Sequence, residues 1–202
     1  SRVGLYKCMV KDHQDNGTSY RDIVSYNLDE YVGIPQNHPQ SYWTFMHENL
    51  FDHVDIKPAN VHIPTPGKDL EASCAQYNAM LKDQPADLQL LGIGSDGHIG
   101  FNEPGTAFDS TVHIAQLKES TIKDNARFFD NDIKKVPTKA MTMGIGNVMA
   151  AKKILMVAAG ANKAQAVKAM VNGPITTDCP ASVLQRHPDV VLVVDEKAAA
   201  LL

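Results

Sequence analysis

The fold is most clearly indicated by the segment Leu88-Gln-Leu-Leu-Gly-Ile-Gly-Ser-Asp-Gly-His-Ile-Gly-Phe-Asn-Glu-Pro104. Its first half, Leu88–Ile93, is apolar apart from Gln89, which is typical of a strand buried on both faces. Its second half is rich in glycine and places polar side chains close together at Asp96, His98, Asn102 and Glu103. In an open parallel sheet, ligands bind outside the carboxyl ends of the strands. The stretch therefore predicts a buried strand that ends in a functional loop.

The polar side chains of this loop are suited to acid–base chemistry. His98 can take and return a proton near neutral pH, because the ordinary pKa of histidine is about 6.5. Asp96 and Glu103 can orient the imidazole and stabilise its charged form, as the third group of a catalytic triad does. An Asp-Gly turn followed by a structural histidine is the alternative interpretation. The strand before the loop and the Asn-Glu-Pro after it favour the catalytic one.

The remainder of the chain alternates short apolar strands with helical patterns, which indicates βαβ units. We expect an α/β fold: a three-layer, Rossmann-like, open and mostly parallel sheet with helices on both faces. With no linker or repeat in sight, residues 1–202 are expected to form a single domain. The expected strands are Ile23–Leu28, Leu88–Ile93, Ala140–Ile145, Ile154–Ala159 and Val190–Val194, and the expected helices are one capped by Ser41, Lys68–Lys82 and Lys163–Val171.

Composition excludes some classes of partner. The chain has 202 residues, 44% of them hydrophobic and 21% charged, as in an ordinary globular protein, and its net charge of −4 argues against non-specific nucleic-acid binding. No apolar run is long enough to span a membrane. Cys8, Cys74 and Cys179 are too few and too far apart for a disulfide framework, which fits reduced thiols in the cytoplasm. The sequence leaves open whether the chain is a monomer or a homo-oligomer.

Three further segments carry charged residues that could serve a site. Asp29 and Glu30 are expected just past the end of the strand Ile23–Leu28. Arg127 lies beside two phenylalanines in the polar segment Thr111–Val136. Either these side chains pack in the ordinary way and Arg127 forms a surface ion pair, or the segment is a mobile cover over the loop. Lys163 follows a strand at the start of a helix, where it is either an exposed lysine or an anion-binding one. Together Arg127 and Lys163 suggest a phosphate site, provided that folding brings them near His98.

Four segments resemble the glucosamine-6-phosphate deaminase family. They are Asn27–Gly33, Gly94–Pro104, Ala126–Asp130 and Gly160–Ala164, and they match the family's motifs in order and with similar spacing. The resemblance covers essentially the whole chain. The family usually begins with a further helix, strand and glycine-rich loop, so we expect a segment upstream of Ser1 to be missing here.

The resemblance implies a reaction and a set of residues. Family members convert glucosamine 6-phosphate and water to fructose 6-phosphate and ammonium, with neither a cofactor nor a metal. Asp29 matches the base that moves the C2 proton, and His98 matches the group that opens the pyranose ring, supported by Asp96 and Glu103. The resemblance further assigns the substrate phosphate to Arg127 and Lys163, and part of the sugar-binding wall to the glycines Gly92 and Gly94.

Two other functions remain open at this point. A 6-phosphogluconolactonase has a related fold and an Asp-Gly-His loop, although we expect a different continuation from Ile99–Glu103. A sugar-phosphate sensor would bind without turnover, as fold relatives fused to DNA-binding domains do. The complete set Asp29, Asp96, His98 and Glu103 argues against a sensor.

Overall fold

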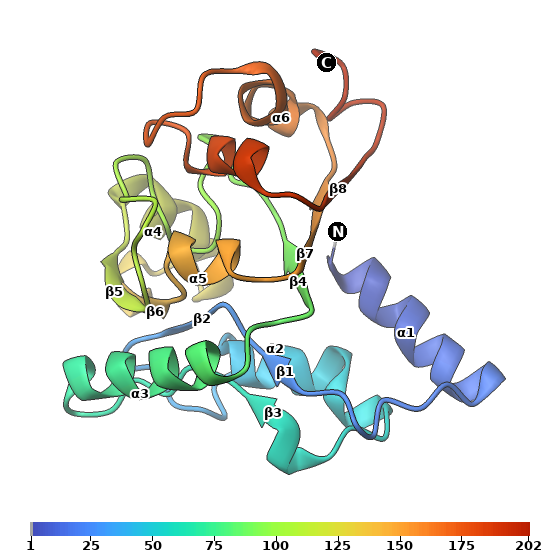
Figure 1. The fold of residues 1–202 in the computed structure, drawn as a ribbon. Helices are drawn as coiled ribbons and strands as arrows, with labels where there is room; N and C mark the ends of the chain where they lie inside the picture. The colour runs from blue at the N-terminus through green and yellow to red at the C-terminus, as the bar shows by residue number, and fades with distance from the viewer. Residues whose placement is uncertain (1) are drawn as a thin grey trace. The chain divides into compact units, whose positions relative to one another are not determined.

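The computed structural model describes residues 2–202, and these form two compact units (Figure 1). The first comprises Cys74–His113 and Thr142–Leu202, and we call it the His98 unit. The second comprises Arg2–Ser73 and Ile114–Met141, and we call it the Asp29 unit. The single domain expected from the sequence stays a prediction.

The His98 unit is built on a parallel sheet with strand order β4-β7-β8. Strand β4 spans Leu88–Leu91, β7 spans Lys153–Ala158 and β8 spans Val190–Val194. The register places Leu91 beside Met156, and Met156 beside Leu192. Helix α6 (Ala164–Asn172) contacts the 3-10 segment η6 (Pro180–Arg186), and α6 lies above β4 and β7 in the view of Figure 1. The helical elements are α3 Leu70–Asp83, which begins in the other unit, α5 Ile145–Met149, η5 Ala161–Lys163, α6 Ala164–Asn172 and η6 Pro180–Arg186.

The core of this unit consists of fully buried apolar side chains from its strands and helices. Leu91 of β4, Ile154 and Met156 of β7 and Val167 of α6 each have an exposed fraction of 0%. Burial of such side chains is the main stabilising contribution to the fold. Two glycine-containing turns leave this core at the carboxyl ends of β4 and β7, and they carry the predicted site residues that belong to this unit.

The Asp29 unit combines helices with short strands. Strand β1 (Ser25–Tyr26) pairs in parallel with β3 (Val61–His62). A second sheet has the order β2-β6-β5, with β2 at Asp29–Tyr31. Strands β5 (His113–Gln116) and β6 (Lys139–Thr142) cross the boundary between the units by one residue each. The helical elements are α1 Arg2–Asn16, α2 Tyr42–Asn49, η1 Phe51–His53, η2 Pro58–Asn60, α4 Glu119–Asn125, η3 Ala126–Phe128 and η4 Ile133–Lys135.

The Rossmann-like α/β class predicted from the sequence is confirmed, and so is the helix capped by Ser41. Several expected boundaries were wrong. Asp29 and Glu30 lie within strand β2 rather than past a strand, since β1 ends at Tyr26 and a second strand follows. The strand expected over Ala140–Ile145 ends at Thr142, because Gly144 already caps α5.

One further expectation was wrong. The strand predicted to be buried on both faces ends at Leu91, and Leu88 at its start is 53% exposed, because β4 is an edge strand among the described ones. The polar segment Thr111–Val136, for which ordinary packing or a mobile cover was expected, contains β5 and α4, and β5 pairs with β6. The role of this segment stays a prediction.

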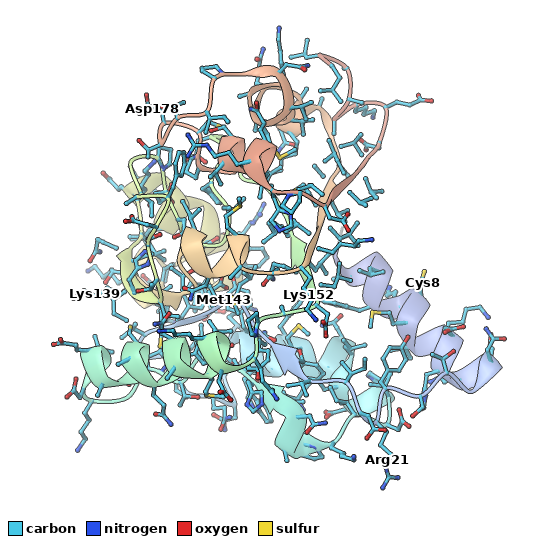
Figure 2. The ribbon with its side chains drawn as sticks, viewed as in Figure 1. Cys8, Arg21, Lys139, Met143, Lys152 and Asp178 are labelled. Atoms are coloured by element: carbon cyan, nitrogen blue, oxygen red, sulfur yellow. The ribbon has the colours of Figure 1, made fainter. Side chains whose placement is uncertain are left out.

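The three cysteines are free thiols. Cys8 is exposed on α1 (Figure 2), whereas Cys74 and Cys179 are buried. Burial raises the pKa of the Cys74 and Cys179 thiols above the ordinary value for cysteine. In the range that the structure describes, no helix has the length and apolar character that crossing a membrane requires.

Candidate active site

The loop after β4 folds back on itself as a tight turn. The Gly94 N–H donates a hydrogen bond to the His98 carbonyl oxygen (2.9 Å), and the Gly97 N–H donates one to the Gly94 carbonyl oxygen (3.1 Å). A Cβ atom added at Gly94 would lie 2.2 Å from Cε1 and Nδ1 of the His98 ring. The imidazole therefore packs directly over the Gly94 backbone, and no other residue leaves room for it there.

His98 is held by two carboxylates. Its Nδ1 lies 2.7 Å from Oδ1 of Asp96, and its backbone N–H donates to the same oxygen (3.2 Å). Oε2 of Glu103 lies 3.8 Å from Nδ1. A carboxylate at Nδ1 fixes the tautomer of the ring and leaves Nε2 to exchange a proton with a substrate. This arrangement suits a general acid–base group.

The electrostatics of Asp96 agree with this arrangement. Partial burial would raise the pKa of the Asp96 carboxyl, but the charge of His98, hydrogen bonds from its backbone and ring, and a contact with Glu103 outweigh burial. The net effect is an Asp96 pKa below the ordinary value of 3.8. Asp96 is therefore ionised at neutral pH and can stabilise a protonated His98.

A second segment of the His98 unit supports this turn from behind. Gly97 has a φ of +86°, and an added Cβ there would lie 2.6 Å from Sγ of Cys179. The Ala181 N–H donates to the Gly97 carbonyl oxygen (2.9 Å). The sequence analysis missed this support, since nothing in the local sequence around Cys179 signals a contact with a turn so far away in the chain.

On its other side the loop is fixed by Asn102, which is fully buried. Its Nδ2 donates to the carbonyl oxygens of Ile99 (2.9 Å) and Met143 (2.8 Å). The Phe101 N–H donates to Oγ1 of Thr142 (3.2 Å). Residues that directly precede Glu103 are therefore anchored to the end of β6 and to the residue that follows it, which limits the movement of the Glu103 carboxylate.

Lys163 lies at the carboxyl ends of the strands, as the His98 turn does. It ends η5, directly before α6, and is half-buried. Strands β4 and β7 are parallel neighbours, so the loops that follow them leave the sheet from one edge. The structure thus brings Gly92, Gly94, Asp96, His98 and Glu103 together in one loop and places Lys163 on the loop that follows the neighbouring strand.

The other two predicted residues belong to the Asp29 unit. Asp29 lies in β2 and is only 8% exposed, whereas Arg127 lies in η3 and is exposed, with its guanidinium 4.7 Å from the centre of the Phe128 ring. Tyr31 connects their segments, because its hydroxyl accepts a hydrogen bond from Nδ2 of Asn125 (3.2 Å). Burial raises the pKa of Tyr31 to about 12, and the charge of Asp29 adds to the effect. The assignment of these residues to a site stays a prediction.

The ligand atoms of Asp96, His98 and Glu103 all lie within 4.8 Å of one another. Such a group could hold a metal ion, although acidic groups commonly cluster without one. The sequence analysis expected no metal, and this expectation stays a prediction.

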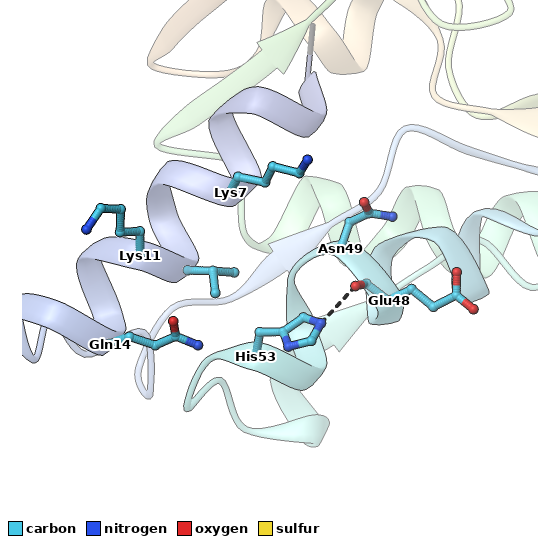
Figure 3. A pocket seen from close by; sticks show the side chains of 7 residues that line it. Lys7, Lys11, Gln14, Glu48, Asn49 and His53 are labelled. Carbon is cyan, nitrogen blue, oxygen red and sulfur yellow. Dashed lines mark hydrogen bonds between the residues drawn. The ribbon is translucent and has the colours of Figure 1, made fainter.

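A hollow in the Asp29 unit lies between α1 and the end of α2 (Figure 3). It has a volume of about 260 Å³, and Nε2 of His53 at its wall bonds the Glu48 carbonyl oxygen (2.8 Å). None of the predicted site residues lines it. Its lining consists of Lys7, Val10, Lys11, Gln14, Glu48, Asn49 and His53.

Comparison with known proteins identifies the family. The sequence profile of the glucosamine-6-phosphate isomerases/6-phosphogluconolactonase family matches residues 3–193. The chain belongs to this family. The resemblance noted in the sequence is thereby confirmed.

Within the family, the chain is similar to proteins named glucosamine-6-phosphate deaminase. The one from Clostridium perfringens is 50% identical over 99% of this chain and 83% of its own length, and the one from Exiguobacterium sibiricum is 52% identical over 100% and 78%. A solved structure of a monomeric glucosamine-6-phosphate deaminase superposes with a TM-score of 0.95 at 43% identity, covering 99% of this chain and 83% of that one.

Lactonases of the family are more distant. The 6-phosphogluconolactonase from Trypanosoma brucei superposes with a TM-score of 0.74 but is only 19% identical, over 98% of this chain and 82% of that one. A likeness at this level shows that the family shares its fold. It does not extend to the activity.

Proposed function

We propose that this chain is a glucosamine-6-phosphate deaminase, which converts glucosamine 6-phosphate and water to fructose 6-phosphate and ammonium. The main support is His98, held by Asp96 and Glu103 at the carboxyl edge of a parallel sheet, in a chain about half identical to deaminases over nearly its full length. The chemistry is an isomerisation coupled to loss of an amine. The names of the relatives support classification as an isomerase or a deaminase. They do not support classification as a hydrolase.

Ring opening is the first step, and it needs a group that moves protons between oxygens. The anomeric hydroxyl must lose its proton and the ring oxygen must gain one. A histidine with one nitrogen held by a carboxylate and the other available can carry out both transfers. His98 is therefore assigned to ring opening, with Asp96 and Glu103 as its supporting carboxylates.

Isomerisation and deamination follow on the open chain. Asp29 removes the C2 proton while the aldehyde oxygen gains a proton, which gives an enolamine. A proton then adds to C1 and the nitrogen loses one, which gives the C2 ketimine with a hydroxyl at C1. Water then adds to the C2=N bond, and the resulting carbinolamine expels ammonia as the C2 carbonyl of fructose 6-phosphate forms. Positioned acid–base groups contribute typically about 10²–10⁴-fold each to such steps.

The phosphate of the substrate is assigned to Arg127 and Lys163. Both cations suit an anion, and Lys163 stands directly before the first turn of α6, whose free N–H groups also favour negative charge. Binding energy from a phosphate distant from the reacting carbons can be used to hold C1 and C2 in place. Gly92 and Gly94 are assigned to the wall beside the sugar.

The proposed partner is thus a small sugar phosphate, and the three free thiols fit a reducing compartment such as the cytoplasm. A sensor that binds without turnover and a lactonase remain the competing functions. The specific observation against a lactonase is the high identity to deaminases beside the low identity to lactonases.

The experiment is an ammonium-release assay with glucosamine 6-phosphate. We expect turnover by the wild type, and a fall of about 10²–10⁴-fold in His98→Gln and in Asp29→Asn. The matched control is His47→Gln, which removes another imidazole–carboxylate pair, with Asp52, at the same 2.7 Å. It should retain full activity. Binding without ammonium release would support a sensor instead, and hydrolysis of 6-phosphogluconolactone a lactonase.

A further inference from the structure

Glu30 is a buried carboxylate for which the proposed mechanism has no use. It follows Asp29 in β2 and is only 6% exposed. Its Oε1 accepts hydrogen bonds from the backbone N–H groups of Tyr31 (2.9 Å) and Tyr42 (3.1 Å), and its Oε2 accepts one from that of Trp43 (3.0 Å). Both of its oxygens are therefore engaged by the backbone.

Two of these donors begin helix α2. The first N–H groups of a helix have no partner within the helix and need external acceptors. Ser41 supplies one as the N-cap residue, since its Oγ accepts from the Thr44 N–H (3.0 Å). Glu30 supplies the acceptors for Tyr42 and Trp43 from a separate strand. Burial raises the pKa of its carboxyl above the ordinary value, and the three backbone hydrogen bonds offset only part of that effect. The start of α2 is thus tied to β2 through one side chain.

This tie fixes how β2 is turned about its own axis. Successive side chains of a strand point to opposite faces, so the Asp29 side chain leaves β2 on the face opposite Glu30. The Tyr31 ring stacks on Tyr42 of α2 (ring centres 5.3 Å apart), which adds a second contact between β2 and the start of this helix. The Val32 N–H donates to the carbonyl oxygen of Lys139 in β6 (2.9 Å), which holds the far end of the strand. Between these two attachments, β2 has little freedom to rotate.

We propose that Glu30 is a positioning residue for Asp29, which locks β2 to the start of α2 and thereby aims the Asp29 carboxylate at the C2 proton. The inference rests on the proposed function of Asp29. Proton transfer from carbon depends strongly on alignment, and a displacement of about 1 Å can cost a rate factor of about 10². A carboxylate that never touches the substrate can therefore control the rate.

Glu30→Gln is the direct test. The amide keeps one acceptor oxygen, but its NH₂ group would face an N–H of the backbone, so at least one of the three bonds is lost. We expect kcat to fall about 10–100-fold, because the base is misaligned. KM should stay within about twofold of the wild type, because the interactions lost are those of the transition state.

A kinetic isotope effect separates positioning from general damage to the fold. The rate is compared between ordinary glucosamine 6-phosphate and the same compound with deuterium at C2. If Glu30 positions Asp29, cleavage of the C2–H bond limits the variant, and its isotope effect is at least as large as that of the wild type. A smaller isotope effect in Glu30→Gln, or a kcat within about twofold of the wild type, overturns the inference.

Ser41→Ala is the matched control. It removes the other side-chain acceptor at the start of α2 without touching β2, and we expect a lower Tm but the kcat and isotope effect of the wild type. If Ser41→Ala reproduces the kinetics of Glu30→Gln, the effect belongs to α2 in general and the proposal is wrong. If Glu30→Gln does not fold, Glu30→Asp, which retains the charge but withdraws it by one methylene, takes its place in the same comparison.

The same assay distinguishes the two proposals. Ammonium release by the wild type together with normal kinetics in the Glu30 variant overturns only the role of Glu30. A wild-type chain that binds glucosamine 6-phosphate and releases no ammonium overturns the proposed function and, with it, the role of Glu30.

Discussion

At the scale of single residues, the position of the His98 ring depends on the absence of a side chain at Gly94. Gly94 has no side chain, and the imidazole occupies the space that a Cβ would need. The ring nitrogen that faces Asp96 is held at 2.7 Å. One methyl group at Gly94 would therefore act on the reaction through the position of His98.

Gly94→Ala should displace the His98 ring, because its Cβ would lie 2.2 Å from two ring atoms. We expect ammonium release to fall by about 10²-fold, as for misplacement of a reacting group by about 1 Å. Gly4→Ala in α1 provides the comparison, since an added Cβ there would meet nothing within 4 Å and ammonium release should stay at the level of the wild type. A Gly94→Ala enzyme with the activity of the wild type would contradict the close packing of this ring.

At the scale of elements, α5 shows how tightly two chain segments meet. Gly144 caps this helix, and the Ile145 N–H donates to Oγ of Ser110 (2.9 Å). The Gly146 N–H donates to the Ser110 carbonyl oxygen (2.9 Å). The segment that precedes β5 thus serves as the cap of a helix that begins more than thirty residues later.

Gly144→Ala should destabilise the protein, since an added Cβ would lie 2.2 Å from the backbone oxygen of Ser110, which cannot rotate away. We expect the free energy of unfolding to fall by about 1–3 kcal/mol, as for other overpacked sites. Urea denaturation measures the change. The control is Gly4→Ala in α1, where the added methyl meets nothing within 4 Å and should leave stability equal or slightly higher. Equal unfolding midpoints for the two variants would contradict the close approach.

At the scale of the whole molecule, the chain passes repeatedly from one unit to the other. Each unit is made of two separate stretches of sequence. Helix α3 and strands β5 and β6 cross the boundaries between them, so neither unit can unfold without disrupting elements of the other. This interleaving favours a single cooperative domain over two independent ones.

We therefore expect a single unfolding transition in urea, as cooperative domains show. The single tryptophan, Trp43, reports on α2 in the Asp29 unit, whereas far-UV circular dichroism reports on both units. The two signals should share one midpoint. Separate midpoints would mean that the units unfold independently and that the single-domain prediction is wrong.

The α/β class, the position of β8 and the capped start of α2 follow from local sequence, because periodicity and capping act over a few residues. The loop that joins Asp96, His98 and Glu103 is also predictable from the sequence, since these residues stand within eight positions of one another. The contact of Cys179 with the Gly97 turn and the hydrogen bonds from the start of α2 to Glu30 are visible in the folded structure alone. Such contacts join residues far apart in the chain, and they arise from the packing of whole elements, which no local preference encodes.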